Sequence, residues 1–115
     1  MLAKKWHATV VISGKTDIIT DGSRTMHIHN GCPEMSDITG SGCMCTTLVG
    51  AFVGAHPEDP FGASAAAMLS MGIAGERAWR SYGHQGLGHF HMGILDELGR
   101  MSASVMEAEG KYDIL

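Results

Sequence analysis

The sequence predicts an α/β fold in which about three short strands precede three helices. Three observations lead to this prediction. Residues 8–13 (ATVVIS) form a β-branched run that is typical of a buried strand. Two further short runs flank Asp21-Gly22, a strong signal for a hairpin turn. After about residue 40, apolar residues recur at the spacing of helices.

The first part of the chain predicts a helix end and a hairpin. Residues 2–6 are expected to form the last turn of a helix, because lysines lie near its C-terminal end. A chain rarely begins on such a turn, so we expect a fragment or a true start farther upstream. The hairpin strands are expected at residues 17–20 and 25–29. Alternation in the second strand predicts Met26 and Ile28 on one face.

The second part predicts three helices joined by glycine-rich loops. A loop at residues 30–37 leads to a helix at 42–55, which His56-Pro57 ends. Asp59-Pro60 has the pattern of an N-cap followed by the first helical residue, so the next helix is expected over about 60–80. A loop at 81–88 precedes a helix at about 89–106, and the acidic tail 107–115 is expected to fray.

These elements amount to a single partial domain over residues 1–115. The helices could cover one face of the strands, and nothing in the sequence obviously covers the other.

Composition excludes several classes of protein. The 115 residues carry a formal net charge of -4 without a basic stripe, which argues against a nucleic-acid partner. Every apolar stretch is interrupted well before the roughly 18 residues of a membrane span. The three cysteines form an odd set, and no secretory signal opens the chain, so reduced thiols and a cytoplasmic location are expected.

The stretch Thr39-Gly40-Ser41-Gly42-Cys43 predicts an anion-binding turn at the start of a helix. The first amides of a helix have no intrahelical partner and carry the positive end of its dipole. Glycines there let an anion such as a transferring phosphoryl group approach the backbone. The stretch lacks the Gly-Lys-Ser/Thr ending of a P-loop and the third glycine of a dinucleotide fingerprint. On spacing alone, a turn packed for steric reasons, with Cys43 as a small buried apolar residue, remains an alternative.

Four segments resemble the C-terminal half of the hydroxyethylthiazole kinases, a family of the ribokinase-like superfamily. They are VVISGKTDIITDG (10–22), NGCPEMSDITGSGCM (30–44), AGERA (74–78) and GLGHFHMGILDEL (86–98). Their order and spacing match the family over nearly all of the chain. The TGSGC turn is the most specific, because most ribokinase-like relatives end it in Asp whereas the thiazole kinases have Cys. The resemblance implies the C-terminal half of a ribokinase-like three-layer fold.

The resemblance also implies a reaction and site residues. Such kinases transfer the γ-phosphoryl group of ATP to the hydroxyl of 5-(2-hydroxyethyl)-4-methylthiazole, with Mg²⁺, in thiamine biosynthesis and salvage. Matched position by position, Cys43 falls where these kinases have the catalytic base. Gly40, Ser41 and Gly42 fall at the anion hole, and Gly40 also lies beside the substrate. Ser13 and Thr39 fall among the ATP contacts. Further nucleotide contacts are expected from the segment after Ser13.

In the family, the N-terminal half supplies much of the thiazole pocket, the acidic groups for Mg²⁺ and an Arg that grips the ATP phosphates. None of these can be assigned here, so no metal ligand is predicted. Family members form trimers, so further copies of this chain are expected as partners. The alternative partner is a missing N-terminal half. The chain departs from the family at residues 86–90, where GLGHF replaces Gly-Pro-Gly-Ser-Phe. The glycines and Phe90 remain, so the following helix is expected to dock.

The cysteines and histidines are also compatible with other kinds of site. A metal cluster could combine the cysteines with a histidine, from the set Cys32, Cys43, Cys45, His27 and His29. It is disfavoured, because zinc sites prefer two or more residues between paired cysteines. The set His84, His89 and His91 is expected to be exposed or at a helix start. As a function, the alternative is a truncated non-catalytic domain that binds nucleotide or self-associates through its sheet. A fragment of a sugar or pyrimidine kinase is disfavoured by Cys43.

Overall fold

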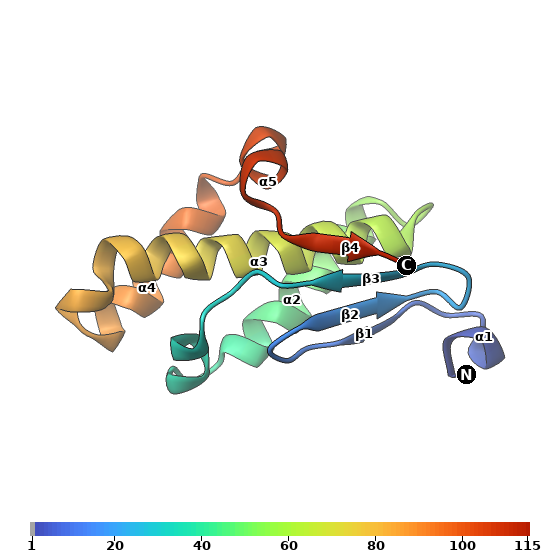
Figure 1. The fold of residues 1–115 in the computed structure, drawn as a ribbon, viewed down its shortest axis with the longest axis horizontal. Helices are drawn as coiled ribbons and strands as arrows, with labels where there is room; N and C mark the ends of the chain where they lie inside the picture. The colour runs from blue at the N-terminus through green and yellow to red at the C-terminus, as the bar shows by residue number, and fades with distance from the viewer. Residues whose placement is uncertain (1) are drawn as a thin grey trace.

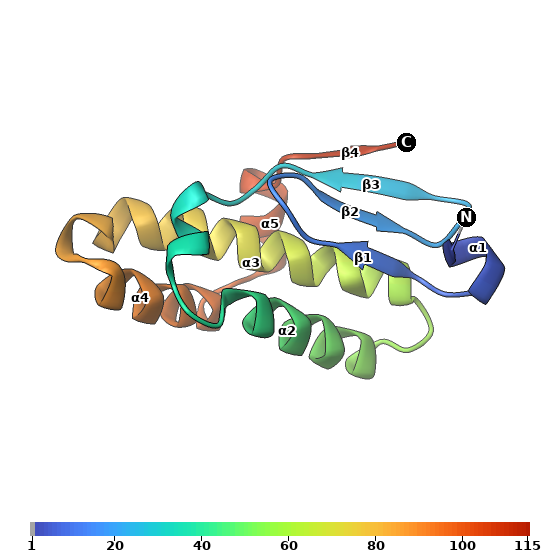
Figure 2. The same ribbon diagram turned by 90° about the horizontal axis from the view of Figure 1, so that it is seen from below.

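The structure is a computed structural model that describes residues 2–115, and it has two layers: an antiparallel sheet and helices packed on one of its faces (Figures 1 and 2). The elements, in chain order, are α1 (Leu2–Trp6), β1 (Val10–Ile12), β2 (Asp17–Thr20), β3 (Thr25–Ile28), the 3₁₀ helix η1 (Pro33–Asp37), α2 (Ser41–Ala55), α3 (Pro60–Tyr82), the 3₁₀ helix η2 (Gly83–Gln85), α4 (Leu87–Gly99), α5 (Ala103–Glu109) and β4 (Tyr112–Ile114). The predicted α/β class is therefore confirmed.

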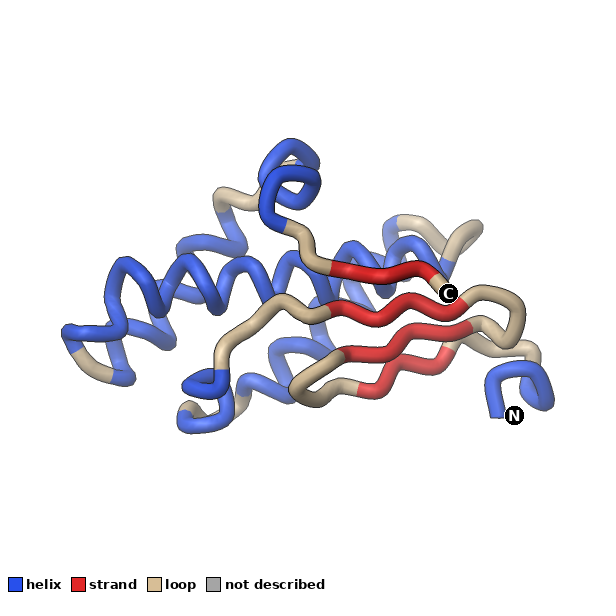
Figure 3. The backbone as a smooth tube through the Cα atoms, in the orientation of Figure 1, coloured by secondary structure: helices blue, strands red, loops and turns tan. Residues whose placement is uncertain are grey.

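The four strands lie side by side in the order β1-β2-β3-β4, and each neighbouring pair is antiparallel (Figure 3). The predicted hairpin joins β2 to β3. Asp21 Oδ1 accepts hydrogen bonds from the amides of Arg24 (2.8 Å) and Ser23 (2.9 Å), which closes the turn. These bonds, led by the one from Arg24, lower the pKa of Asp21 to about 2. The prediction that Met26 and Ile28 share a face is also confirmed, since both are buried against the helices.

The expectation of a frayed tail over residues 107–115 is wrong. Helix α5 extends to Glu109, and β4 pairs with β3 through the register Met26–Ile114, His27–Asp113 and Ile28–Tyr112. Backbone bonds extend this pairing at both ends, from His29 N to Lys111 O (2.7 Å) and from Leu115 N to Thr25 O (2.8 Å). The tail is ordered because β3 offers it an otherwise unpaired edge.

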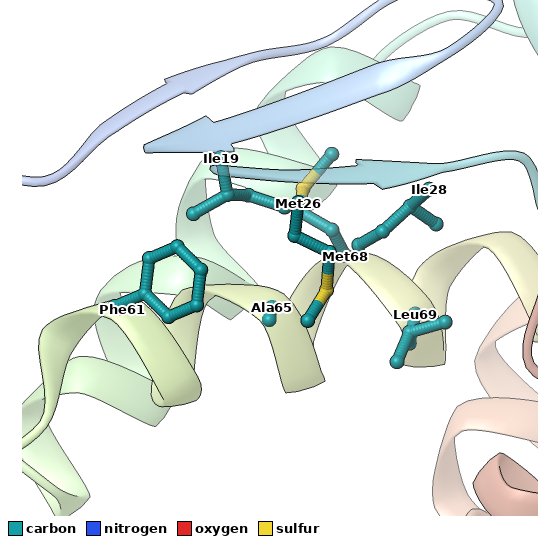
Figure 4. Packing of buried hydrophobic residues seen from close by; sticks show 7 residues of the cluster. All are labelled: Ile19, Met26, Ile28, Phe61, Ala65, Met68 and Leu69. Atoms are coloured by element: carbon teal, nitrogen blue, oxygen red, sulfur yellow. The ribbon is translucent and has the colours of Figure 1, made fainter. Parts of the chain in front are cut away.

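The main core lies between the sheet and α3. Ile19, Met26 and Ile28 meet a stripe of α3 side chains, which consists of Phe61, Ala65, Met68 and Leu69 (Figure 4). Burial of each large apolar side chain contributes about 1.5–3 kcal/mol. Asp59 begins α3 as predicted, because its Oδ1 accepts the Gly62 amide at 3.1 Å.

A second core joins α3 to α4 and fixes the glycine loop. Phe90 is fully buried there and makes an edge-to-face contact with Trp79, with ring centroids 5.3 Å apart. The helix after the GLGHF segment therefore docks as expected. It is shorter than predicted, because the chain turns after Gly99 and Ser102 caps a separate helix, α5, by accepting the Val105 amide at 3.4 Å.

The opposite face of the sheet carries no helix of the described residues (Figure 2). The first strand, predicted to be buried, is a short edge strand, and Ile12 is 56% exposed. The β-branched run alternates between a covered and an open face, which explains the difference. In the described part of the chain, no helix has both the length and the apolar character needed to cross a bilayer.

Candidate active site

Gly40 makes the turn that starts α2. Its φ is +89°, a left-handed conformation that glycine adopts without a side-chain clash. The turn is anchored from the preceding side by Ile38, which is buried in the α3–α4 core. The Gly40 carbonyl then accepts the Met44 amide at 2.9 Å, the first hydrogen bond of the helix.

Three backbone amides at this turn have no acceptor. Within residues 2–115, no hydrogen bond uses the N–H groups of Ser41, Gly42 or Cys43, and no side chain caps the helix. A Cβ built on Gly40 or on Gly42 would meet no atom within 4 Å, so the space in front of the backbone is open. Steric packing therefore does not explain the glycines. The 15-residue helix directs its positive end at this space, which suits an anion.

A cavity of about 800 Å³ adjoins the turn. Its walls come from the β1–β2 turn (residues 13–17), the segment after β3 (29–33), the start of α2 and the middle of α3. Ser13, Ser41 and Gly42 line it.

Thr39, Gly40 and Cys43 are outside the lining, and all three are exposed. The alternative in which Cys43 fills space in a core is therefore wrong. The structure brings the predicted residues to one corner but divides them between the cavity and the outer side of α2.

The cavity lining also holds two basic side chains outside the predicted anion and nucleotide site, of which His29 was named only as a candidate metal ligand. Lys15 and His29 are the cationic or potentially cationic side chains in its lining. His29 is held at both ring nitrogens, by Thr16 Oγ1 (3.5 Å) and by Asp113 Oδ2 of β4 (2.9 Å). Lys15 belongs to the segment after Ser13, from which further contacts were expected. No local pattern reveals His29, because its partner lies 84 residues away in the sequence.

Two half-buried cysteines face the cavity. Burial removes water from both thiols, and this desolvation is the main reason that the pKa of Cys32 and the pKa of Cys45 are raised. The Cys32 thiol points to the carbonyl oxygen of Gly75, at 3.7 Å. Both thiols are thus kept in their neutral form and act as walls of the cavity.

The residues of this chain do not fit a magnesium site by themselves. Among residues 2–115, Asp17 is the only carboxylate in the cavity lining, and its pKa is raised mainly by burial. The described residues contain no group of three or more His, Cys, Asp or Glu side chains that could hold a metal ion. Mg²⁺ prefers ionised carboxylates, waters and phosphates in an octahedral arrangement.

Comparison with known proteins identifies the family. The sequence model of the hydroxyethylthiazole kinase family matches residues 1–104. The chain belongs to the hydroxyethylthiazole kinase family. It is 44% identical over 110 residues to the hydroxyethylthiazole kinase of Clostridium beijerinckii, which covers 96% of this chain and 40% of that protein. It is 41% identical over 112 residues to that of Thermoanaerobacter pseudethanolicus, which covers 97% of this chain and 42% of that protein.

A solved structure supports the same assignment. The hydroxyethylthiazole kinase of Pyrococcus horikoshii superimposes with a TM-score of 0.89 at 33% sequence identity. The match covers 98% of this chain and 43% of that structure. The chain therefore spans about two fifths of the length of these hydroxyethylthiazole kinases, and its layered fold is that of part of a family member.

Proposed function

We propose that this chain forms the phosphoryl-transfer corner of a hydroxyethylthiazole kinase, which uses ATP to phosphorylate 5-(2-hydroxyethyl)-4-methylthiazole in thiamine biosynthesis. The observation that supports this most directly is the start of α2. Three free amides and an open glycine backbone lie at the positive end of a helix, beside a cavity of about 800 Å³. Such a corner stabilises the negative charge of a phosphoryl group in transfer.

In this proposal, ATP occupies the cavity and extends its phosphates toward α2. Ser13, in the cavity lining, would contact the nucleotide there, and Thr39, exposed just outside the lining, would contact the part that reaches the α2 turn. Lys15 also lines the cavity and could contact the phosphates. Ser41 and Gly42 present their amides to the γ-phosphoryl group. Fixed donors of this kind require no reorganisation during the reaction, which is their main contribution to the rate.

Cys43 would act on the other side of the same turn. Its thiolate accepts the proton of the substrate hydroxyl, the hydroxyl oxygen bonds to the γ-phosphorus, and ADP leaves. The side chain is exposed and not buried in the cavity wall, so an alcohol can approach it from outside the chain. Gly40, which is exposed beside it, would contact this alcohol.

The remaining parts of the site are assigned to protein outside this chain. The relatives are more than twice as long as the matched region. Magnesium ligands, an Arg for the phosphates and much of the thiazole pocket belong to that additional length or to neighbouring subunits of an oligomer.

Two measurements test the proposal. Titration calorimetry should detect binding of a non-hydrolysable ATP analogue with Mg²⁺ to the 115-residue chain. Turnover of the thiazole alcohol should fall by about 100-fold or more in Cys43→Ala, as expected for loss of a general base. Thr47→Ala, one turn later and exposed on the same helix, is the matched control. Turnover at the wild-type rate in Cys43→Ala would show that the base assignment is wrong. Nucleotide binding without turnover, even when the additional length of a family member is supplied as a second polypeptide, would favour the non-catalytic domain.

A further inference from the structure

Asn30 is a buried polar residue in the cavity wall. It lies two residues after the end of β3, is 5% exposed and lines the cavity together with its neighbours His29 and Gly31. Burial of an amide side chain is costly unless its donors and acceptor are used. The partners of Asn30 therefore indicate what the side chain does.

All three hydrogen bonds of the Asn30 side chain go to segments far away in the sequence. Its Nδ2 donates to Glu76 Oε1 of α3 (2.8 Å) and to the carbonyl oxygen of Glu109 (2.9 Å). Its Oδ1 accepts the amide of Lys111 at 2.6 Å. Lys111 Nζ also binds Glu76 Oε2 at 2.9 Å, which joins α3 to the C-terminal segment a second time.

The backbone of Asn30 is fixed as closely as its side chain. Gly72 of α3 lies directly against it, and both residues line the cavity. A Cβ at Gly72 would lie 2.7 Å from Asn30 Cβ and 2.9 Å from the Asn30 carbonyl carbon. Only glycine permits this approach, because real Cβ atoms do not tolerate such distances.

We propose that Asn30 is a positioning residue for the nucleotide: it fixes the cavity wall at residues 29–33 by bonding it to α3 and to the segment that leads into β4. This inference rests on the proposed binding of nucleotide in the cavity. On this inference, residues 109–111 support the binding site, although they lie beyond residues 1–104, the region that the family model matches. Asn30 acts on the ligand through the wall and not by chemistry of its own.

A purely structural role would have different consequences. The Arg77 guanidinium also joins α3 to α5, by donating from Nε to Glu109 Oε2 (3.0 Å), but Arg77 is not in the cavity lining. Arg77→Gln should therefore lower stability without disturbing the wall. It is the matched control for Asn30→Ala, since both residues bond to Glu109, Arg77 to its carboxylate and Asn30 to its carbonyl oxygen.

The test uses the 115-residue chain and two readouts. The first is the rate at which Cys32, inside the wall, reacts with iodoacetamide relative to Cys43, measured by peptide mass spectrometry. The second is the dissociation constant of the ATP analogue. In Asn30→Ala, Cys32 labelling should be about tenfold faster and the dissociation constant about tenfold higher, the effect expected when a buried hydrogen-bonded group is lost. In Arg77→Gln both should stay within about twofold of wild type, with a lower melting temperature.

Asn30→Asp keeps the shape of the side chain but turns its donor into an acceptor that faces Glu76. Adding Glu76→Gln restores a donor, so the double variant should recover part of the slow Cys32 labelling and can be tested even where Asn30→Ala does not fold. Equal effects of Asn30→Ala and Arg77→Gln on Cys32, or no recovery in the double variant, would overturn the inference. Altered Cys32 labelling with no nucleotide binding by any variant would overturn the proposed nucleotide site while leaving Asn30 as the support of the wall.

Discussion

Cys43 and Cys45 are two positions apart on α2, yet only Cys45 lines the cavity, while Cys43 is exposed outside the lining. Residues two apart on a helix point in directions about 200° apart, so the first turn of α2 separates the two thiols. The proposed nucleotide side and the proposed acceptor side of the reaction thus lie on opposite sides of one helical turn.

The first prediction concerns the reactivity of the three thiols. At neutral pH, Cys43 should react with iodoacetamide at least about tenfold faster than Cys32 or Cys45, because burial raises the pKa of those two thiols. Labelling at each site can be followed by peptide mass spectrometry in the folded protein, with the urea-unfolded chain as control. Equal rates at all three thiols before unfolding would contradict the arrangement described.

The second prediction tests the left-handed turn. Gly40→Ala should cost about 1–2 kcal/mol of unfolding free energy, because an alanine with φ near +89° is strained. Gly42→Ala is the matched control: its site is helical and open, so the same change should be neutral or stabilise by up to about 1 kcal/mol. Urea unfolding of both variants measures the difference. A Gly40→Ala variant as stable as Gly42→Ala would show that the turn has another conformation.

Local sequence signals predicted most of the fold. Asp21-Gly22 and Asp59-Pro60 specify their turn and helix start through contacts within three residues, so both could be recognised without the structure. Strand β4 could not, because Tyr112–Ile114 is short and exposed and becomes a strand only by pairing with β3. The break between α4 and α5 was missed because Ser102 caps a helix within a continuous apolar pattern.

The candidate site also has a part that the sequence predicts and a part that it does not. The turn around Gly40 and Cys43 was predicted, because glycines before a helix have a local meaning. The cavity was not, since its walls come from segments that meet only in the folded chain. His29 bonds to Asp113, 84 positions away, and Asn30 bonds to Glu76 and Lys111, 46 and 81 positions away, and no spacing in the sequence predicts such pairs.

The third prediction tests the start of α3. Asp59→Ala should lower the unfolding free energy by about 1 kcal/mol, since the Gly62 amide loses its acceptor. Asp59→Asn keeps an acceptor oxygen and should be nearly neutral. It also removes the charge that faces Arg24 at 3.7 Å, so the pair of variants separates capping from this surface ion pair. Thermal and urea unfolding would provide the comparison, and equal losses in both variants would assign the effect to the charge.

The fourth prediction concerns acid stability. Hydrogen bonds from Arg77 are the main cause that holds the pKa of Glu109 below its usual value of 4.5. The Glu109 carboxylate therefore binds a proton less readily in the folded state than in the unfolded state. Its contribution to the unfolding free energy is complete above about pH 4.5 and is lost as the pH falls through the lower pKa of the folded state. Glu109→Gln should therefore remove about 0.5–1 kcal/mol at neutral pH and flatten the decline in stability below about pH 4.5. Glu107→Gln is the control, because Glu107 is exposed and forms no ion pair within residues 2–115. Urea unfolding between about pH 7 and pH 3 measures both curves, and an acid decline in Glu109→Gln as steep as in Glu107→Gln would contradict the assignment.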